Sequence, residues 1–169
     1  MSRQTLKFAI ISDVHDNLVN LNKVLSYCQN KKIKTLICCG DLASMETWEY
    51  LKNKFKGKIY FVFGNMDKDY FRNVAQKNNL EEKNPNVKIF YKIGEFKIKN
   101  LKIAITHFPN IARDLAKTGK YNLVFFGHTH QPSLERQNNT LLLNPGNTAN
   151  LYYARQASPY LILKKTGQN

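Results

Sequence analysis

Two histidines that lie two residues apart follow the apolar run 123–126, in the segment Gly127-His128-Thr129-His130. A short apolar run between polar segments predicts a buried β-strand. Ligands of open α/β sheets bind at the carboxyl ends of strands, and side chains at i and i+2 of an extended segment point the same way. We therefore expect His128 and His130 to face one small ligand, with a pair of solvated loop histidines as the alternative.

The same pattern, an apolar run followed by polar side chains, recurs along the chain. The further members of the set are Asp13 and His15 after 5–12, Asp41 after 33–38, Asn65 after 58–63, and His107 after 101–106. Single members have structural explanations, since Asp13 or Asn65 could cap a helix and His107 could be a buried core residue. Because all four histidines of the protein belong to the set, we expect the side chains to form one site.

The donor types in this set indicate metal chemistry. Imidazole, carboxylate and amide oxygen together suit divalent transition metals. Seven donors exceed the four that a structural zinc ion takes, so we expect two ions about 3.5–4 Å apart that share a bridging carboxylate. Mn²⁺ is the ion expected first, with Zn²⁺, Fe²⁺, Ni²⁺ or Co²⁺ as alternatives. Such a pair lowers the pKa of a bound water, whose hydroxide can attack phosphorus in line.

Alternating strand and helix patterns would position these residues. The first third of the chain predicts strands over 5–12, 33–38 and 58–63 with helices over 17–30 and 45–55 between them, which favours a parallel α/β sheet. After a short helix over 70–80, the pattern predicts a helix over 109–117 and strands over 87–91, 95–99, 101–106, 121–126, 134–136, 140–143 and 160–163. We expect residues 1–169 to form a single domain, since no linker or repeat is present.

Composition narrows the class of protein. A chain with 43% hydrophobic and 12% aromatic residues is an ordinary globular one. No apolar stretch is long enough to span a bilayer, and no signal peptide is visible, so we expect a cytoplasmic protein without a membrane partner. The sparse, odd set of cysteines, Cys28, Cys38 and Cys39, predicts buried thiols rather than disulfides.

The net charge of +14 leaves a nucleic-acid partner open as a hypothesis. The basic residues are nevertheless scattered along the chain, and a solvated lysine-rich surface is the simpler explanation. Composition leaves the oligomeric state open as well, including a homo-oligomer.

The ordered motifs resemble those of the calcineurin-like metallophosphoesterases. The matching segments are Asp13-Val14-His15, Gly40-Asp41, Gly64-Asn65-x-Asp67, Thr106-His107 and Gly127-His128-Thr129-His130. The short Asn144-Pro145-Gly146 signature points to the small, single-domain phosphodiesterase branch of bacteria and archaea. This resemblance covers nearly the whole chain, and it implies a four-layer αββα sandwich of two mixed β-sheets flanked by helices, with a di-metal site on the loops at the strand ends.

The resemblance also implies a role for each matching residue. One metal ion would be held by Asp13, His15, Asp41 and His130, and Asp41 would bridge to a second ion that Asn65, His107 and His128 also hold. The predicted catalytic residues are Asn65, His107 and Asp67, the last as a group that orients the ligands.

Two positions depart from the pattern of the family. Many members place a histidine directly after the asparagine ligand, where it is thought to protonate the leaving group, but here that position is Met66, which cannot transfer a proton. Phe108 and Pro109 follow His107 where relatives often have glycine and a further histidine, so an apolar wall is expected near the site. General acid catalysis typically contributes 10²–10⁴-fold, so we expect weak activity on unactivated alkyl esters and better activity on esters with good leaving groups.

The function predicted from the sequence is that of a metal-dependent phosphoric ester hydrolase, more specifically a phosphodiesterase that acts on a small phosphate ester by attack of a di-metal-bound hydroxide. One alternative is a non-catalytic metal-binding scaffold, because the family resemblance includes a trafficking-complex subunit that uses this fold for protein contacts. Another is a nuclease or RNA-processing enzyme, which the net charge suggests. Lys68 and Arg72, close to Asn65 in the sequence, are open as substrate contacts.

Overall fold

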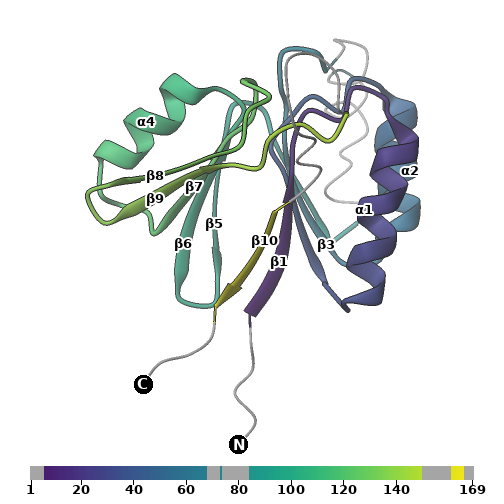
Figure 1. Cartoon of the computed structure of the whole chain (residues 1–169), viewed down its shortest axis with the longest axis horizontal. Coiled ribbons are helices and arrows are strands. Elements are labelled where there is room, and N and C mark those ends of the chain that lie inside the picture. Colours follow the sequence, from purple (N-terminus) through teal and green to yellow (C-terminus); the bar gives the residue numbers. More distant parts are fainter. Residues whose placement is uncertain (1–5, 68–72, 74–83, 150–160, 166–169) are drawn as a thin grey trace, which may run out of the picture.

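Two five-stranded β-sheets pack face to face, with helices on their outer faces (Figure 1). The computed structural model describes residues 6–67, 73, 84–149 and 161–165. The first sheet has the order β10-β1-β2-β3-β4 and consists of β1 (Leu6–Ile11), β2 (Thr35–Cys38), β3 (Lys58–Val62), β4 (Val87–Phe90) and β10 (Leu161–Lys165). The second has the order β5-β6-β7-β9-β8 and consists of β5 (Ile93–Ile98), β6 (Leu101–Thr106), β7 (Leu123–Phe125), β8 (Ser133–Gln137) and β9 (Thr140–Asn144).

Both sheets have a parallel centre, with one antiparallel edge strand in the first sheet and two in the second. In the first sheet β1, β2, β3 and β4 are parallel and β10 is antiparallel to β1. In the second, β6, β7 and β9 are parallel, and β5 and β8 pair antiparallel with their neighbours. The carboxyl ends of the parallel strands therefore gather at one edge of each sheet, and the two edges lie on the same side of the molecule (Figure 1).

In the described ranges, three helices cover the sheets. The outer face of the first sheet carries α1 (Leu18–Asn30) and α2 (Met45–Lys54), and that of the second carries α4 (Pro109–Lys117). Asn17 caps α1 by accepting a hydrogen bond from the Asn20 N–H at 3.0 Å, as its side-chain type favours. Pro109 stands at the start of α4, where its missing N–H costs nothing. Both predicted helix starts are confirmed.

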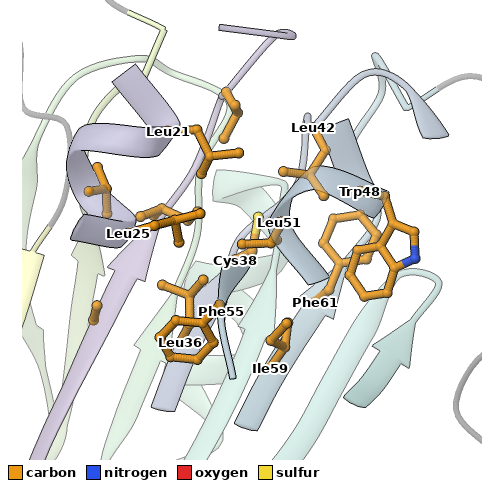
Figure 2. Close-up of a cluster of buried hydrophobic side chains, with 14 of the residues drawn as sticks. Leu21, Leu25, Leu36, Cys38, Leu42, Trp48, Leu51, Phe55, Ile59 and Phe61 are labelled. Atoms are coloured by element: carbon orange, nitrogen blue, oxygen red, sulfur yellow. The ribbon is translucent and has the colours of Figure 1, made fainter. Parts of the chain in front are cut away.

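Three clusters of buried side chains fill the spaces between the two sheets and between each sheet and its helices. Trp48 and Leu51 of α2 pack on the first sheet, as Figure 2 shows. Between the sheets, Phe8 of β1 meets Phe125 of β7 with ring centroids 6.1 Å apart. A third cluster lies between the second sheet and α4, where Ala116 is fully buried. Because central strands such as β1 and β7 are buried on both faces, their sequences are continuously apolar rather than alternating. The predicted four-layer αββα sandwich is confirmed.

Most predicted strands and helices are present, with small differences at their ends. The second strand begins at Thr35 rather than at residue 33, because the Ile33 N–H bonds to the carbonyl of Cys28 at the end of α1. The hairpin around Asn138 is longer than predicted, over 133–144. The predicted helix 70–80 falls outside the described residues apart from residue 73, and Lys68, Arg72 and residue 160 lie outside them as well.

The expectation of buried thiols is met by the described residues. The cysteine thiols are free and buried, and burial raises the pKa of Cys28 to about 11. Among the described helices, none combines the length and the apolar character that a membrane span requires.

Candidate metal centre

The predicted site residues follow the carboxyl ends of five strands from both sheets. Their positions are Asp13 and His15 after β1, Asp41 after β2, Asn65 after β3, His107 after β6, and His128 and His130 after β7. The structure brings all seven side chains together, in two groups that share Asp41.

The first group consists of Asp13, His15 and His130. The two imidazole Nε2 atoms lie 3.2 Å apart, and Asp13 Oδ1 lies 3.1 Å from His130 Nε2 and 3.8 Å from His15 Nε2. Asp13 is fully buried, and its Oδ1 has no hydrogen-bond partner among the described residues. A buried carboxylate oxygen without a partner is costly, and a cation placed among these three atoms would satisfy it.

The second group consists of Asn65, His107 and His128. Asn65 Oδ1 lies 2.9 Å from both His107 Nε2 and His128 Nδ1, and these two nitrogens are 3.3 Å apart. The three atoms converge on one point from loops of different sheets. Two imidazoles and an amide oxygen form a donor set that suits a divalent transition metal.

Asp41 lies between the two groups. Its Oδ2 is 3.2 Å from His107 Nε2 in the second group and 3.9 Å from His15 Nε2 in the first. Its Oδ1 accepts a hydrogen bond from the Met66 N–H at 2.8 Å, which fixes the orientation of the carboxylate. One oxygen that faces both groups is the arrangement that a bridging ligand requires, so the donor set fits two divalent ions.

Contacts of His107 and Asp13 with neighbouring groups favour the protonation states in which these side chains can bind a metal. His107 Nδ1 lies 2.8 Å from the Cys39 carbonyl oxygen, so Nδ1 carries the hydrogen and, in the neutral ring, Nε2 keeps its lone pair. Burial alone would raise the pKa of Asp13, but the facing imidazoles of His130 and His15 outweigh it and hold that pKa well below its usual range. Asp13 is therefore ionised at any ordinary pH.

The raised pKa of His107 predicts how the affinity of the site for a metal ion depends on pH. Burial alone would lower the pKa of His107, but the hydrogen bond and charge of Asp41 outweigh it and raise that pKa. A proton on Nε2 must leave before an ion can bind there, so metal affinity falls as the pH falls through this raised pKa. We expect the apparent affinity to rise by about tenfold per pH unit in that range for each displaced proton.

Calorimetric titration of metal-stripped protein with Mn²⁺ or Zn²⁺ between about pH 5.5 and 8 would measure this trend. Comparison of buffers with different ionisation enthalpies would count the protons released. An affinity that does not change with pH would contradict the role of His107 as a ligand.

The backbone at the site is mostly left-handed rather than extended. Five of the seven residues have positive φ, namely Asp13 (56°), His15 (44°), Asp41 (57°), His128 (72°) and His130 (58°). Such conformations are unusual for residues other than glycine and cluster at functional sites. The expectation that an extended segment directs His128 and His130 at one ligand is therefore wrong, because the chain turns between them and places them in different groups.

Gly64 and Gly127 lie where another part of the chain approaches the backbone too closely to leave room for a side chain. A Cβ atom on Gly64 would collide with Asp41 Oδ1, and one on Gly127 would collide with Ser12 Oγ. Both glycines thus let a loop pass directly over a ligand-bearing strand end. The Gly-Asn and Gly-His pairs of the sequence reflect this steric requirement.

Asp67 contacts the backbone of the ligand loops. Its buried carboxylate accepts hydrogen bonds from the N–H groups of Gly64 at 2.6 Å, Ala43 at 2.9 Å and Asp41 at 3.1 Å. Burial raises the pKa of Asp67, although the bonds from Gly64 and Ala43 oppose the shift. The carboxylate ties the loop after β2 to the loop after β3, which suits a positioning residue rather than a catalytic one.

Asn147 is a polar contact of the site that the sequence did not single out. Its side-chain amide lies 3.1 Å from His130 Nδ1, on the opposite side of the ring from Nε2. The nearby Asn144 amide donates to the Gly127 carbonyl at 2.9 Å. The signal available in the sequence was the Asn-Pro-Gly segment, which ends one residue before Asn147.

The chain belongs to the calcineurin-like phosphoesterase superfamily, since the family profile matches residues 6–167. Among named proteins, the phosphodiesterase MJ0936 of Methanocaldococcus jannaschii is 28% identical over 149 residues, which cover 83% of each chain. The predicted family is thereby confirmed, and it supports a hydrolase that acts on phosphate esters.

Solved structures that share the fold include the following two. One, described as a novel archaeal phosphodiesterase, has a TM-score of 0.77 and 25% identity, and the match covers 95% of this chain and 100% of that chain. The other, vacuolar protein sorting 29 from Cryptosporidium parvum, has a TM-score of 0.70 and 22% identity over 96% of this chain and 86% of that chain. The second likeness shows the fold alone.

Proposed function

We propose that the protein is a phosphodiesterase that works with two divalent metal ions. One ion would be held by Asp13, His15, Asp41 and His130, and the other by Asp41, Asn65, His107 and His128. When bound, such a pair supplies Lewis acidity and a nucleophilic water at neutral pH. Mn²⁺ is the ion we propose first, and the imidazole-rich donor set also suits Zn²⁺, Fe²⁺, Ni²⁺ or Co²⁺.

The observation that carries this proposal is the Asp13 carboxylate. In the part of the chain that the structure describes, its Oδ1 is buried without a hydrogen-bond partner while two imidazole Nε2 atoms face it. A site built only for stability would pair this oxygen with a donor. The related archaeal phosphodiesterase adds support for a diester substrate.

Side chains at the second group would orient the substrate. Asn65 is exposed, and its Oδ1 already faces two imidazoles, so its amide nitrogen is left to donate a hydrogen bond to a phosphoryl oxygen. His107 is fully buried and holds its ring against the Cys39 carbonyl. We propose that His107 keeps the second group rigid rather than passing a proton to the substrate.

Metal removal and restoration test the proposed function. Stripped protein would be loaded with Mn²⁺, Zn²⁺ or Ni²⁺ and assayed for bound metal, unfolding temperature and hydrolysis of an activated aryl phosphodiester. We expect two ions per chain, a raised unfolding temperature and turnover that returns with the metal. Absence of bound metal would refute the metal centre, whereas two bound ions without turnover on any diester would favour the scaffold alternative.

A substitution at Met66 tests the absence of a general acid. Met66 is 52% exposed beside Asn65, and its backbone N–H donates a hydrogen bond to Asp41. We expect Met66→His to raise kcat about 10-fold on alkyl esters and to leave esters of acidic phenols nearly unchanged, since a general acid matters most for poor leaving groups. Rates for a series of leaving groups of different pKa would measure the change, and Met66→Gln is the polar control that cannot donate a proton of suitable acidity.

The nucleic-acid alternative rests on the net charge of +14. It predicts that binding of an oligonucleotide weakens steeply between low and moderate salt, because phosphate contacts release counterions. Binding that is absent, or that does not respond to salt, would remove this alternative without affecting the phosphodiesterase proposal.

A further inference from the structure

A groove lined by three lysines lies on the second sheet, away from the metal centre. It has a volume of about 360 Å³, and the charged residues that line it are Lys97, Lys102, Lys120 and Glu95. Tyr121 lines it as well. We call this cavity the lysine groove.

The alternation of side chains places the lysine groove on the outer face of the second sheet. On β5, Phe96 points toward the first sheet, since its ring stacks on that of Tyr60 with centroids 3.7 Å apart, so Lys97 points outward. Lys102 of β6 pairs directly with Lys97, and residues paired in this way lie on one face. Further along β6, α4 packs on the same outer face at Ala104. The groove therefore lies beside α4.

The lysine groove is separate from the metal centre. Lys97 and Lys102 flank the turn between β5 and β6, at the end of the sheet opposite the ligand loops (Figure 1). Lys102 precedes His107 by five residues along β6, which corresponds to roughly 16 Å in an extended strand. A phosphate held in the groove therefore cannot also contact the metal ligands.

The lysines of the groove favour an anionic ligand. Like charges directly opposite each other on adjacent strands destabilise the pair, yet Lys97 and Lys102 occupy such positions. Lys97, Lys102 and Lys120 form no ion pair with any described residue. Glu95 contributes one carboxylate to the lining, so the groove keeps an excess of positive charge at neutral pH.

Backbone hydrogen bonds hold the lysines in place. The side chain of Asn122 accepts a hydrogen bond from the Lys102 N–H at 2.8 Å, and the Asn122 N–H donates to the Lys102 carbonyl at 2.9 Å. The Lys120 N–H donates to Thr118 Oγ1 at 3.2 Å. Burial and the nearby carboxylate of Glu95 raise the pKa of Tyr121, so its hydroxyl keeps its proton at neutral pH. A groove with a fixed backbone loses little freedom when a ligand binds.

Positive charge continues along the amino ends of the parallel strands. Exposed lysines at this edge of the first sheet are Lys7 on β1, Lys34 before β2 and Lys58 at the start of β3. The Lys58 N–H bonds to the Lys34 carbonyl at 2.8 Å, so these two residues are adjacent. Asp13 and Asp41 lie at the opposite edge, in the metal centre. A small anion would use the groove alone, whereas a chain of phosphates can also follow this edge.

We propose that the lysine groove binds the phosphate backbone of a nucleic-acid strand, as a docking site distinct from the metal centre. Lysine ammonium groups bind phosphates as point charges, and a nucleic-acid backbone repeats such phosphates at short intervals. The inference goes beyond the proposed function and does not depend on it. A nuclease would instead hold the strand over the metal centre.

Binding of a labelled oligonucleotide tests the proposal. The metal-loaded protein would be titrated into a fluorescein-labelled oligothymidylate, followed by fluorescence anisotropy at several salt concentrations, with a gel to verify that the strand stays intact. The combined variant Lys97→Gln, Lys102→Gln and Lys120→Gln should raise Kd about 10- to 100-fold at about 0.1 M salt. It should also reduce the slope of log Kd against log salt by about 2, since each phosphate contact of a single strand contributes about 0.7.

The matched control removes the same charge from the other side of the molecule. The combined variant Lys23→Gln, Lys32→Gln and Lys54→Gln replaces three exposed lysines on and beside α1 and α2, which cover the outer face of the first sheet (Figure 1). Its Kd should change by less than about 3-fold, because salt screens charges at that distance. The groove variant should unfold at a temperature no lower than the wild-type protein, since it relieves the repulsion between two opposed lysines.

The possible results separate this inference from the proposed function. Absence of binding, or equal weakening in the groove variant and the control, would overturn the inference and leave the phosphodiesterase intact. Inorganic triphosphate that binds as tightly as the oligonucleotide would also overturn it and assign the groove to a small polyphosphate. Hydrolysis of an activated aryl diester should be the same in wild type and both variants. If no sample hydrolyses it, the proposed function fails, while oligonucleotide binding that depends on the groove still supports the inference.

Discussion

Asp41→Asn should lower diester hydrolysis by about 10³-fold or more, with the fold intact. Removal of a single preorganised electrostatic group at an active site typically costs 10²–10³-fold, and Asp41 serves both groups because its Oδ2 faces His107 and His15. Asparagine keeps an oxygen that can accept the Met66 N–H now bonded to Oδ1, so the loop should stay in place. Turnover with saturating Mn²⁺ and the number of bound ions measure the effect.

The matched control for this variant is Asp114→Asn. Asp114 lies on α4 with its side chain 74% exposed and pairs only with Lys117 among the described residues. The same chemical change there should leave turnover and metal content unchanged. If Asp41→Asn kept both wild-type turnover and two bound ions, Asp41 would not be the bridge and the division into two groups would be wrong.

Asp67→Ala should lower the free energy of unfolding by about 3–5 kcal/mol. The substitution leaves the N–H groups of Gly64, Ala43 and Asp41 without their acceptor, and each unsatisfied buried donor costs about 1–3 kcal/mol. Relief of the buried carboxylate offsets part of this loss. Urea unfolding of the metal-free protein measures the effect without a contribution from metal binding.

Two controls separate the hydrogen bonds from the charge at this position. Asp67→Asn retains one oxygen and should fall between wild type and alanine, because its amide NH₂ must face one of the three donors. Asp114→Ala should change the free energy of unfolding by less than about 0.5 kcal/mol, as expected for an exposed pair. A value for Asp67→Ala as small as that of Asp114→Ala would show that the two ligand loops do not depend on Asp67.

The residues of the candidate site were predictable because their signal is local. Each follows an apolar run that forms a strand, and parallel strands collect their carboxyl ends at one edge. Strand and helix positions followed from the same periodicity and from caps such as Asn17 and Pro109. The layered arrangement of the two sheets came from the resemblance to a family rather than from periodicity.

The residue types and their spacing did not by themselves reveal which donors belong to which of the two groups. His15 and His130 are 115 residues apart yet have adjacent Nε2 atoms, and that contact depends on how the two sheets pack. The left-handed backbone at Asp13 and His128 is likewise imposed by crossing loops, against the local preference of these residues. The place of Phe108 was visible in advance, since an apolar wall was expected near the site and its ring lies beside those of His107 and His128.

The origin of the donors in both sheets has a consequence for assembly. Asp13 and His15 come from the first sheet and His130 from the second, and the second group combines Asn65 with His107 in the same way. In the proposed holoenzyme each ion is therefore a cross-link between the two halves of the sandwich, comparable to a bridge that closes a long loop. A chain whose sheets have not yet docked offers only part of each donor set, so metal capture would follow docking and would lock the interface at which Phe8 packs on Phe125.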